Sequence, residues 1–289
     1  MASRRQRRGR GADLRQIRLY TRNLGQEDPA DDSPMKIAMN VRMSLWLLLF
    51  FVLLFAGPLL TIASGRVSIR GDWSTATHRP SGLAPDAAVH RDAIVQVYSG
   101  RTFGWRGAFA VHSWLAAKPA GASGYTRYEV IGWYARSGRS AVSISDMRAA
   151  DAEWYGAAPR LVRELRGAEA EAVIAKLPGA AASYPYAHAY SAWPGPNSNT
   201  FIAHLGREIP ELRLTMPSTA VGKDYLPLSQ ALSRTPSGTG YQASLYGVLG
   251  ALAGIDEGFE LNLFGMVVGI DLVRPALKLP GLGRVPPGV

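Results

Sequence analysis

The chain has 289 residues, 47% of them hydrophobic, and it contains no cysteine. This length is sufficient for one sizeable globular domain with an appendage. Because cysteine is absent, disulfide bonds and every cysteine-peptidase mechanism are excluded.

Positive charge is concentrated at the N-terminus. The formal net charge is +10, and ten of the 32 lysine and arginine residues lie before residue 43. Residues 1–35 show no hydrophobic periodicity, so we interpret them as a disordered basic cytoplasmic tail. Basic residues beside a membrane span set its topology and contact lipid headgroups. We therefore expect the membrane lipid bilayer as a partner, and no nucleic acid.

An apolar run follows this tail. Residues 43–64, between Arg42 and Arg66, carry no charged side chain and are long enough to cross a hydrocarbon layer of about 30 Å. The run exceeds the hydrophobic region of a cleaved signal peptide, although residues 63–65 are small enough to permit cleavage. We favour an uncleaved transmembrane helix. The basic tail then predicts a single-pass protein of the bacterial inner membrane, with a cytoplasmic N-terminus and a periplasmic main domain.

A polar linker is expected over residues 65–91, and an exported domain over residues 92–275. Runs rich in β-branched and aromatic residues predict short strands over 93–98, 107–118, 125–134, 141–144 and 161–165. Good helix formers predict a helix over 168–177 that ends at Pro178-Gly179. Because side chains alternate along a strand, His112 and Trp114 should share a face.

The most informative turn lies at residues 194–201. Two prolines and a glycine interrupt any preceding element, and three small polar residues suited to capping follow them. Apolar residues then recur at helical spacing, which predicts a helix over 197–208. Such a helix start presents free N–H groups and a positive dipole end, where a nucleophile or an anion can be stabilised.

The last third of the chain is apolar and glycine-rich. Residues 241–255 and 259–272 form two apolar runs, each too short for a second span. We expect a buried helix followed by a strand or hairpin, with contact to the membrane surface as an alternative. Four prolines at or beyond residue 275 predict an extended C-terminal tail over 276–289.

Three interpretations of the central turn remain open. His112 could act as a base for a Ser198 nucleophile, with Glu129 orienting the imidazole. Alternatively, the polar residues at 197–199 only cap the helix, and His112 is a half-buried, hydrogen-bonded histidine. The third interpretation is a ligand site, and its expected residues are Trp114, His188, Asn197 and Asn199.

Other chemistry has little support in the sequence. There is no HExxH motif, no phosphate-binding or dinucleotide-binding glycine motif, and no Gly-x-Ser-x-Gly motif. A zinc site would require His112, His188 and His204 to meet without any motif that indicates it. We therefore expect no metal and no cofactor.

Three stretches, residues 103–114, 193–201 and 274–281, resemble an uncharacterised bacterial family of domain-of-unknown-function proteins with an N-terminal membrane anchor. The resemblance spans about residues 66–285 and brings no known activity. More distantly, the order of parts is similar to circularly permuted papain-like amidases and acyltransferases, in which a histidine strand precedes a cysteine at a helix start. That likeness implies an α+β fold with an antiparallel sheet and a central helix. It would place His112 at the base, and Ser198 or Asn199 where cysteine is expected.

These observations lead to three functional hypotheses. The first is a membrane-anchored envelope protein with a papain-like domain that lacks the catalytic cysteine. It would bind a peptide, glycan or lipid component between His112 and residues 197–199. The second is a serine-dependent amidase or acyltransferase that uses Ser198 and His112. The third is a structural or assembly partner of another membrane protein, which it would contact through residues 241–272.

Overall fold

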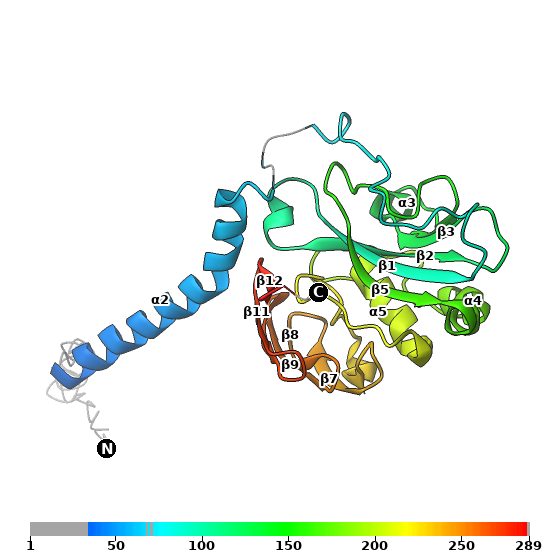
Figure 1. Cartoon of the computed structure of the whole chain (residues 1–289). Helices are drawn as coiled ribbons and strands as arrows, with labels where there is room; N and C mark the ends of the chain where they lie inside the picture. Colours follow the sequence, from blue (N-terminus) through cyan, green and yellow to red (C-terminus); the bar gives the residue numbers. More distant parts are fainter. Residues whose placement is uncertain (1–33, 68, 70–71, 288–289) are drawn as a thin grey trace, which may run out of the picture. The chain divides into compact units, whose positions relative to one another are not determined.

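A computed structural model describes residues 34–67, 69 and 72–287 (Figure 1). The expected basic tail therefore lies almost entirely outside the described residues. The chain forms two compact units that divide after Phe50. Of the first unit, the structure describes only residues 34–50, which form the beginning of one helix. The second unit, from Phe51 onward, contains the rest of that helix and all of the strands.

The N-terminal helix α2 runs from Pro34 to Ala63. Among the described residues, it is the one helix long and apolar enough to cross a membrane. It begins before the expected start at residue 43, because proline is favoured in the first turn of a helix and residues 35–42 continue the helical run. Pro58 lies inside the last turns.

The C-terminal part of α2, within the second unit, packs against the turn at residues 280–282. Thr61 Oγ1 donates hydrogen bonds to the carbonyl oxygen of Gly57, at 2.9 Å, and to that of Gly281, at 3.2 Å. A side chain at Gly57 would overlap the carbonyl oxygen of Pro280. The glycine therefore permits a close approach between this helix and the end of the chain.

The first sheet has five antiparallel strands in the order β4-β3-β2-β1-β5. Its strands are β1 (Ile94–Arg101), β2 (Val111–Lys118), β3 (Thr126–Val130), β4 (Val142–Ser145) and β5 (Arg160–Arg166). The structure confirms the five expected strands and the α+β class. It differs at two ends, where the short helices η1 (Gly104–Ala108) and α3 (Gly132–Arg136) replace the start of the second and the end of the third expected strand.

Two helices, α4 (Gly167–Ala182) and α5 (Ser198–Glu208), pack on one face of this sheet (Figure 1). Helix α4 continues past Pro178-Gly179, where the sequence predicted its end. The last turn is retained because Leu177, Ala180 and Ala181 are buried in the core, and such tertiary packing outweighs the low helix propensity of proline and glycine.

The opposite face of the first sheet is also covered. Tyr98, Trp114 and Trp154 form a second buried cluster there. The carboxylate of Asp151 accepts hydrogen bonds from the backbone N–H groups of Leu83, at 2.6 Å, and of Ala84, at 3.1 Å. Part of the expected linker over residues 65–91 is therefore bound to the domain.

A second sheet contains seven strands, and each pairs antiparallel with the next in sequence. Its strands are β6 (Leu232–Arg234), β7 (Gly240–Leu245), β8 (Leu249–Gly254), β9 (Gly258–Leu263), β10 (Met266–Asp271), β11 (Ala276–Leu279) and β12 (Gly283–Val285). The prediction of a helix over residues 241–255 was wrong, because these residues form a hairpin of two strands, β7 and β8. Its turn contains Gly247 at φ 69°, a conformation that glycine adopts without strain. The last two strands occupy the expected C-terminal tail.

Candidate functional site

The start of α5 is a complete capping box. The side-chain oxygen of Asn197 accepts hydrogen bonds from the backbone N–H groups of Asn199, at 2.9 Å, and Thr200, at 3.2 Å. In return, the backbone N–H of Asn197 donates to the hydroxyl oxygen of Thr200 at 3.0 Å. This geometry confirms the predicted helix start. Ser198 is the first residue of the helix and is buried.

The amide groups of the two asparagines hold the helix start to the rest of the domain. Asn199 Nδ2 donates to the carbonyl oxygens of Val111, at 2.9 Å, and Val221, at 2.7 Å. Asn197 Nδ2 donates to the carbonyl oxygens of Ala192 and Val221. These donors are committed to the backbone of β2 and of neighbouring loops, so they hold α5 in place.

His112 and Glu129 are brought together, as the sequence suggested. His112 Nε2 lies 3.2 Å from Glu129 Oε2, and Arg127 Nη2 donates to the same carboxylate oxygen at 3.0 Å. All three side chains are buried. The imidazole also stacks on the ring of Trp154, with 3.5 Å between the ring centroids.

His112 and Ser198 lie on opposite sides of the first sheet. Along β2, Val111 and Leu115 belong to the core that includes α5, whereas Trp114 belongs to the cluster on the opposite face. His112 contacts Trp114 and Trp154, so its ring lies on the face opposite α5. The first sheet thus separates the imidazole from the start of the helix.

The other expected ligand residues are also placed. Trp114 is fully buried, and its indole N–H donates to the carbonyl oxygen of Ala150 at 2.7 Å. His188 is exposed in the loop before α5. Within residues 34–67, 69 and 72–287, no group of three histidine or carboxylate side chains gathers where it could hold a metal ion.

Burial lowers the pKa of His112 below its ordinary value of 6.5, although Glu129 partly offsets this effect. Burial would raise the pKa of Glu129, but the hydrogen bond from His112 and the charge of Arg127 outweigh it and lower that pKa. The neutral imidazole and the charged carboxylate are therefore the favoured forms.

These shifts predict a pH dependence of stability. Because folding lowers the pKa of His112, the unfolded chain binds more protons than the folded chain once the pH falls below 6.5. Above pH 6.5 His112 is neutral in both states and costs the folded state no stability. As the pH falls below this value, the free energy of unfolding decreases, because the unfolded chain takes up the proton more readily. We expect the free energy of unfolding in detergent, measured with denaturant between about pH 7 and about pH 5, to fall less steeply in His112→Gln than in the wild type. Burial also lowers the pKa of His204, but His204 is present in both proteins and cancels in the comparison. Equal slopes would contradict the prediction.

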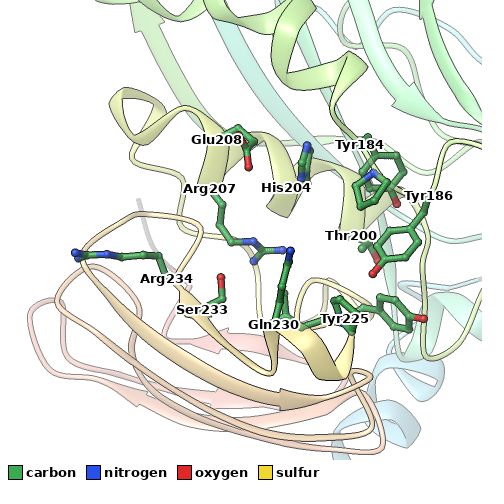
Figure 2. A pocket seen from close by; sticks show the side chains of 13 residues that line it. Tyr184, Tyr186, Thr200, His204, Arg207, Glu208, Tyr225, Gln230, Ser233 and Arg234 are labelled. Carbon is green, nitrogen blue, oxygen red and sulfur yellow. The ribbon is translucent and has the colours of Figure 1, made fainter.

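A separate cavity of about 220 Å³ lies beside α5 (Figure 2). The apolar side of this helix, with Phe201, Ile202 and Leu205, packs into the core. Its polar side lines the cavity with Thr200, His204, Arg207 and Glu208. The other walls include Tyr184, Tyr186, Tyr225, Gln230, Ser233 and Arg234.

Arg207 is the unusual group in this cavity. Its Nη1 atom is buried and has no hydrogen-bond partner, and Figure 2 shows its guanidinium reaching toward Gln230. Burial lowers the pKa of Arg207 to about 10, which leaves the group positively charged at neutral pH. Asp224 interacts with this charge electrostatically, but its carboxylate is hydrogen-bonded to Lys223 and Asn262.

A second unpartnered donor lies in the same cavity. The hydroxyl of Tyr184 is buried without a hydrogen-bond partner, and burial raises the pKa of Tyr184, which keeps the phenol protonated. Buried polar groups in native proteins are nearly always paired, and an unpaired one costs about 1–3 kcal/mol. The Arg207 guanidinium and the Tyr184 hydroxyl are thus two hydrogen-bond donors that line the cavity and have no partner among the described residues.

Part of this cavity could have been found in the sequence. Residues 200, 204, 207 and 208 recur at helical spacing on the polar side of α5. The complete tyrosine wall could not, because Tyr184 and Tyr186 come from one loop and Tyr225 from another. Tyr186 lies between Tyr184, at 5.6 Å, and Tyr225, at 5.4 Å, measured between ring centroids.

Residues 92–225 match a family described as a protein of unknown function (DUF3750). The match supports the resemblance to an uncharacterised family of domain-of-unknown-function proteins. It covers the first sheet, α4 and α5, and it ends before the second sheet begins. No curated protein and no solved structure matches the chain.

Proposed function

We propose that the chain is a membrane-anchored binding protein whose main domain holds the anionic group of an envelope component in the cavity beside α5. One observation carries this proposal. Arg207 presents a buried Nη1 atom with no hydrogen-bond partner in a cavity of about 220 Å³. A guanidinium offers several N–H donors in one plane, which suits the paired oxygens of a carboxylate or a phosphate.

The composition of the lining supports an anion. Tyr184, Gln230 and Ser233 provide further hydrogen-bond donors in the cavity, and Glu208 is the one carboxylate that lines it. The guanidinium of Arg234 lies over the Tyr241 ring and points away from Arg207 (Figure 2). The size of the cavity limits the bound part to a small group, since drug-sized ligands occupy sites of about 300–1,000 Å³. The remainder of a peptide, glycan or lipid would therefore extend outside the cavity.

The proposal includes a papain-like ancestry without catalysis. The histidine strand precedes the helix that begins at Ser198, as in the permuted papain-like enzymes, and no cysteine occurs in the chain. A serine amidase or acyltransferase is not favoured, because the ring of His112 faces Glu129 and Trp154 on the side of the sheet away from α5.

The membrane part of the proposal rests on α2. An apolar helix preceded by a basic segment suits a single-pass inner-membrane protein, with the N-terminus in the cytoplasm and the main domain in the periplasm. In that arrangement the cavity faces the envelope, where carboxylates of peptides and phosphates of lipids or glycans are at hand.

Calorimetric titration of the full chain in detergent tests the binding site. The probes are inorganic phosphate, glycerol phosphate for a lipid headgroup, and a D-alanyl dipeptide for a peptide carboxylate. We expect at least one of them to bind the wild type, and Arg207→Gln to weaken its binding by about tenfold or more, because a charged hydrogen bond contributes about 1.5–3 kcal/mol.

Arg213→Gln is the matched control, since Arg213 is an exposed arginine outside the cavity that pairs with Asp256. It should bind the same probe as the wild type does. Near-UV circular dichroism of both variants establishes that the fold is retained. If none of the three probes binds the wild type, or if Arg207→Gln binds as tightly as Arg213→Gln, the proposed site is incorrect.

A further inference from the structure

The second sheet places most of its polar side chains on its inner side and apolar side chains on its outer side. Charged residues within strands β7–β11 are Glu260, Asp271 and Lys278, and all three are buried on its inner side. Gln242 and Asn262 also lie buried on that side. An antiparallel sheet with one solvated face normally places its apolar residues inward and its polar residues outward. Here the inner side is mainly polar, although Leu252 and Val267 are also buried on it, and the outward side is apolar.

The outward rows of this sheet are apolar across successive strands. The strand register joins them into three rows: Tyr241, Ala253, Phe259, Ile270, Leu277 and Val285; Ala243, Ala251, Leu261 and Val268; and Leu245, Leu249, Leu263 and Met266. We call these three rows the outer face. Tyr241 is 55% exposed, Leu249 51% and Leu277 52%.

A continuous apolar surface that spans six strands is unusual on the water-exposed side of a soluble protein, so we expect another molecule to contact it. The largest apolar patch on a typical soluble monomer covers about 300–600 Å² and often has a function. Protein–protein interfaces of any size contain hydrogen bonds, about one per 100–200 Å². Within the three rows, the Tyr241 hydroxyl is the one side-chain group that can form a hydrogen bond. At the edge of the sheet, Arg234 of β6 pairs with Tyr241, and its guanidinium lies over that ring at 4.8 Å from the centroid. This chemistry fits hydrocarbon better than it fits a protein partner.

The outer face also adjoins the membrane helix. Gly57 and Thr61 of α2 pack against the turn between β11 and β12, through Pro280 and Gly281. Leu277 and Val285, the outer-face residues of these two strands, pair with each other across the same hairpin. The apolar surface of the sheet therefore starts at the strands that contact the helix.

The margin of the outer face has the residues expected at a headgroup layer. Tyr246 and Phe264 lie exposed in the turns at one end of the strands, and the indole N–H of Trp193 donates to the carbonyl oxygen of Phe264 at 2.8 Å. Tyrosine and tryptophan favour the membrane–water interface. At the other end, Arg274 is exposed in the turn between β10 and β11, where its charge can contact lipid phosphates.

We propose that the outer face of the second sheet lies on the membrane that α2 crosses, with its apolar rows in contact with lipid acyl chains. This inference rests on the membrane anchor of the proposed function and is independent of the cavity beside α5. Neighbouring strands are hydrogen-bonded to each other across the sheet, so the face that contacts hydrocarbon consists mainly of side chains.

Because the chain lacks cysteine, single cysteine variants can be labelled at one position each. Leu261→Cys carries an environment-sensitive NBD fluorophore on the outer face. The matched control is Ala175→Cys on the exposed side of α4, and Leu48→Cys in α2 is the reference for lipid contact. Each full-length variant is reconstituted into vesicles of phosphatidylethanolamine and phosphatidylglycerol, with and without lipids that carry a doxyl quencher on the acyl chain.

We expect Leu261→Cys to show a blue-shifted emission and to be quenched by the doxyl lipid, as Leu48→Cys is, whereas Ala175→Cys shows neither effect. Quenching of Leu261→Cys no greater than that of Ala175→Cys would overturn the proposal. A blue shift that depends on protein concentration and is insensitive to the doxyl lipid would also overturn it, because it would identify a second copy of the chain as the cover. Failure of Leu48→Cys to be quenched would instead remove the membrane anchor.

Discussion

Replacing Glu260 by glutamine is expected to lower the free energy of unfolding by about 3–5 kcal/mol, the cost of removing one partner from a buried ion pair. Glu260 is buried between two lysines: Lys223 donates to it at 2.6 Å, and Lys278 forms an ion pair with its other oxygen. Burial would raise the pKa of Glu260, but the two ammonium groups outweigh it and lower that pKa. In the variant, Lys223 keeps the carboxylate of Asp224, whereas Lys278 keeps only the carbonyl oxygen of Glu257.

Denaturant unfolding in detergent measures this change. Glu211→Gln is the matched control, because Glu211 forms an exposed ion pair with Lys176 on the surface. Solvent screens such a pair, so its loss should leave the unfolding midpoint close to that of the wild type. Equal stability of the Glu260→Gln variant and the wild type would show that the network does not hold the second sheet in place.

Replacing Phe201 by alanine should cost a similar amount, about 3–5 kcal/mol, because it removes a large side chain from a closely packed core. Phe201 is fully buried in α5 and packs edge-on against Tyr184, with 5.0 Å between the ring centroids. Since Tyr184 also lines the cavity, the substitution should weaken anion binding together with stability.

Phe259→Ala provides the same chemical change at a position where the ring is 44% exposed on the outer face. In detergent, it should lower the free energy of unfolding much less than Phe201→Ala does. Chemical denaturation monitored by circular dichroism compares the two variants. A larger loss in Phe259→Ala would mean that the outer face contributes more to the folded state than the core around α5.

The local elements could be predicted from the sequence because their causes are local. Asn197 followed by Thr200 and a run of apolar residues is sufficient to begin a helix, and β-branched runs are sufficient for the strands near residues 94 and 111. Alternation also placed His112 and Trp114 on one face. Which face receives α5 could not be predicted, because every residue of β2 is buried and both of its faces are covered.

The strand or hairpin expected over residues 259–272 is present as β9 and β10, whereas the first hairpin of the second sheet, formed by β7 and β8, was missed for a different physical reason. Its residues alternate with a period of two, as Gln242 and Ser244 show between the exposed Tyr241 and Leu245. We assumed that apolar residues point inward, so the many small and apolar side chains suggested a buried helix. The cavity was missed because its unpaired donors, Arg207 and Tyr184, are recognised only once their surroundings are known.

The contact between α2 and the final hairpin has a consequence for biosynthesis. Thr61 and Gly281 are 220 residues apart in sequence, yet their groups are hydrogen-bonded. The end of α2 is therefore completed by a hairpin that is synthesised 220 residues later. Contacts of such long sequence separation form late and slowly. Until the hairpin is synthesised, Gly57 has no Pro280 beside it, so a nascent chain stalled before this hairpin would expose the surface of α2 around Gly57 and Thr61.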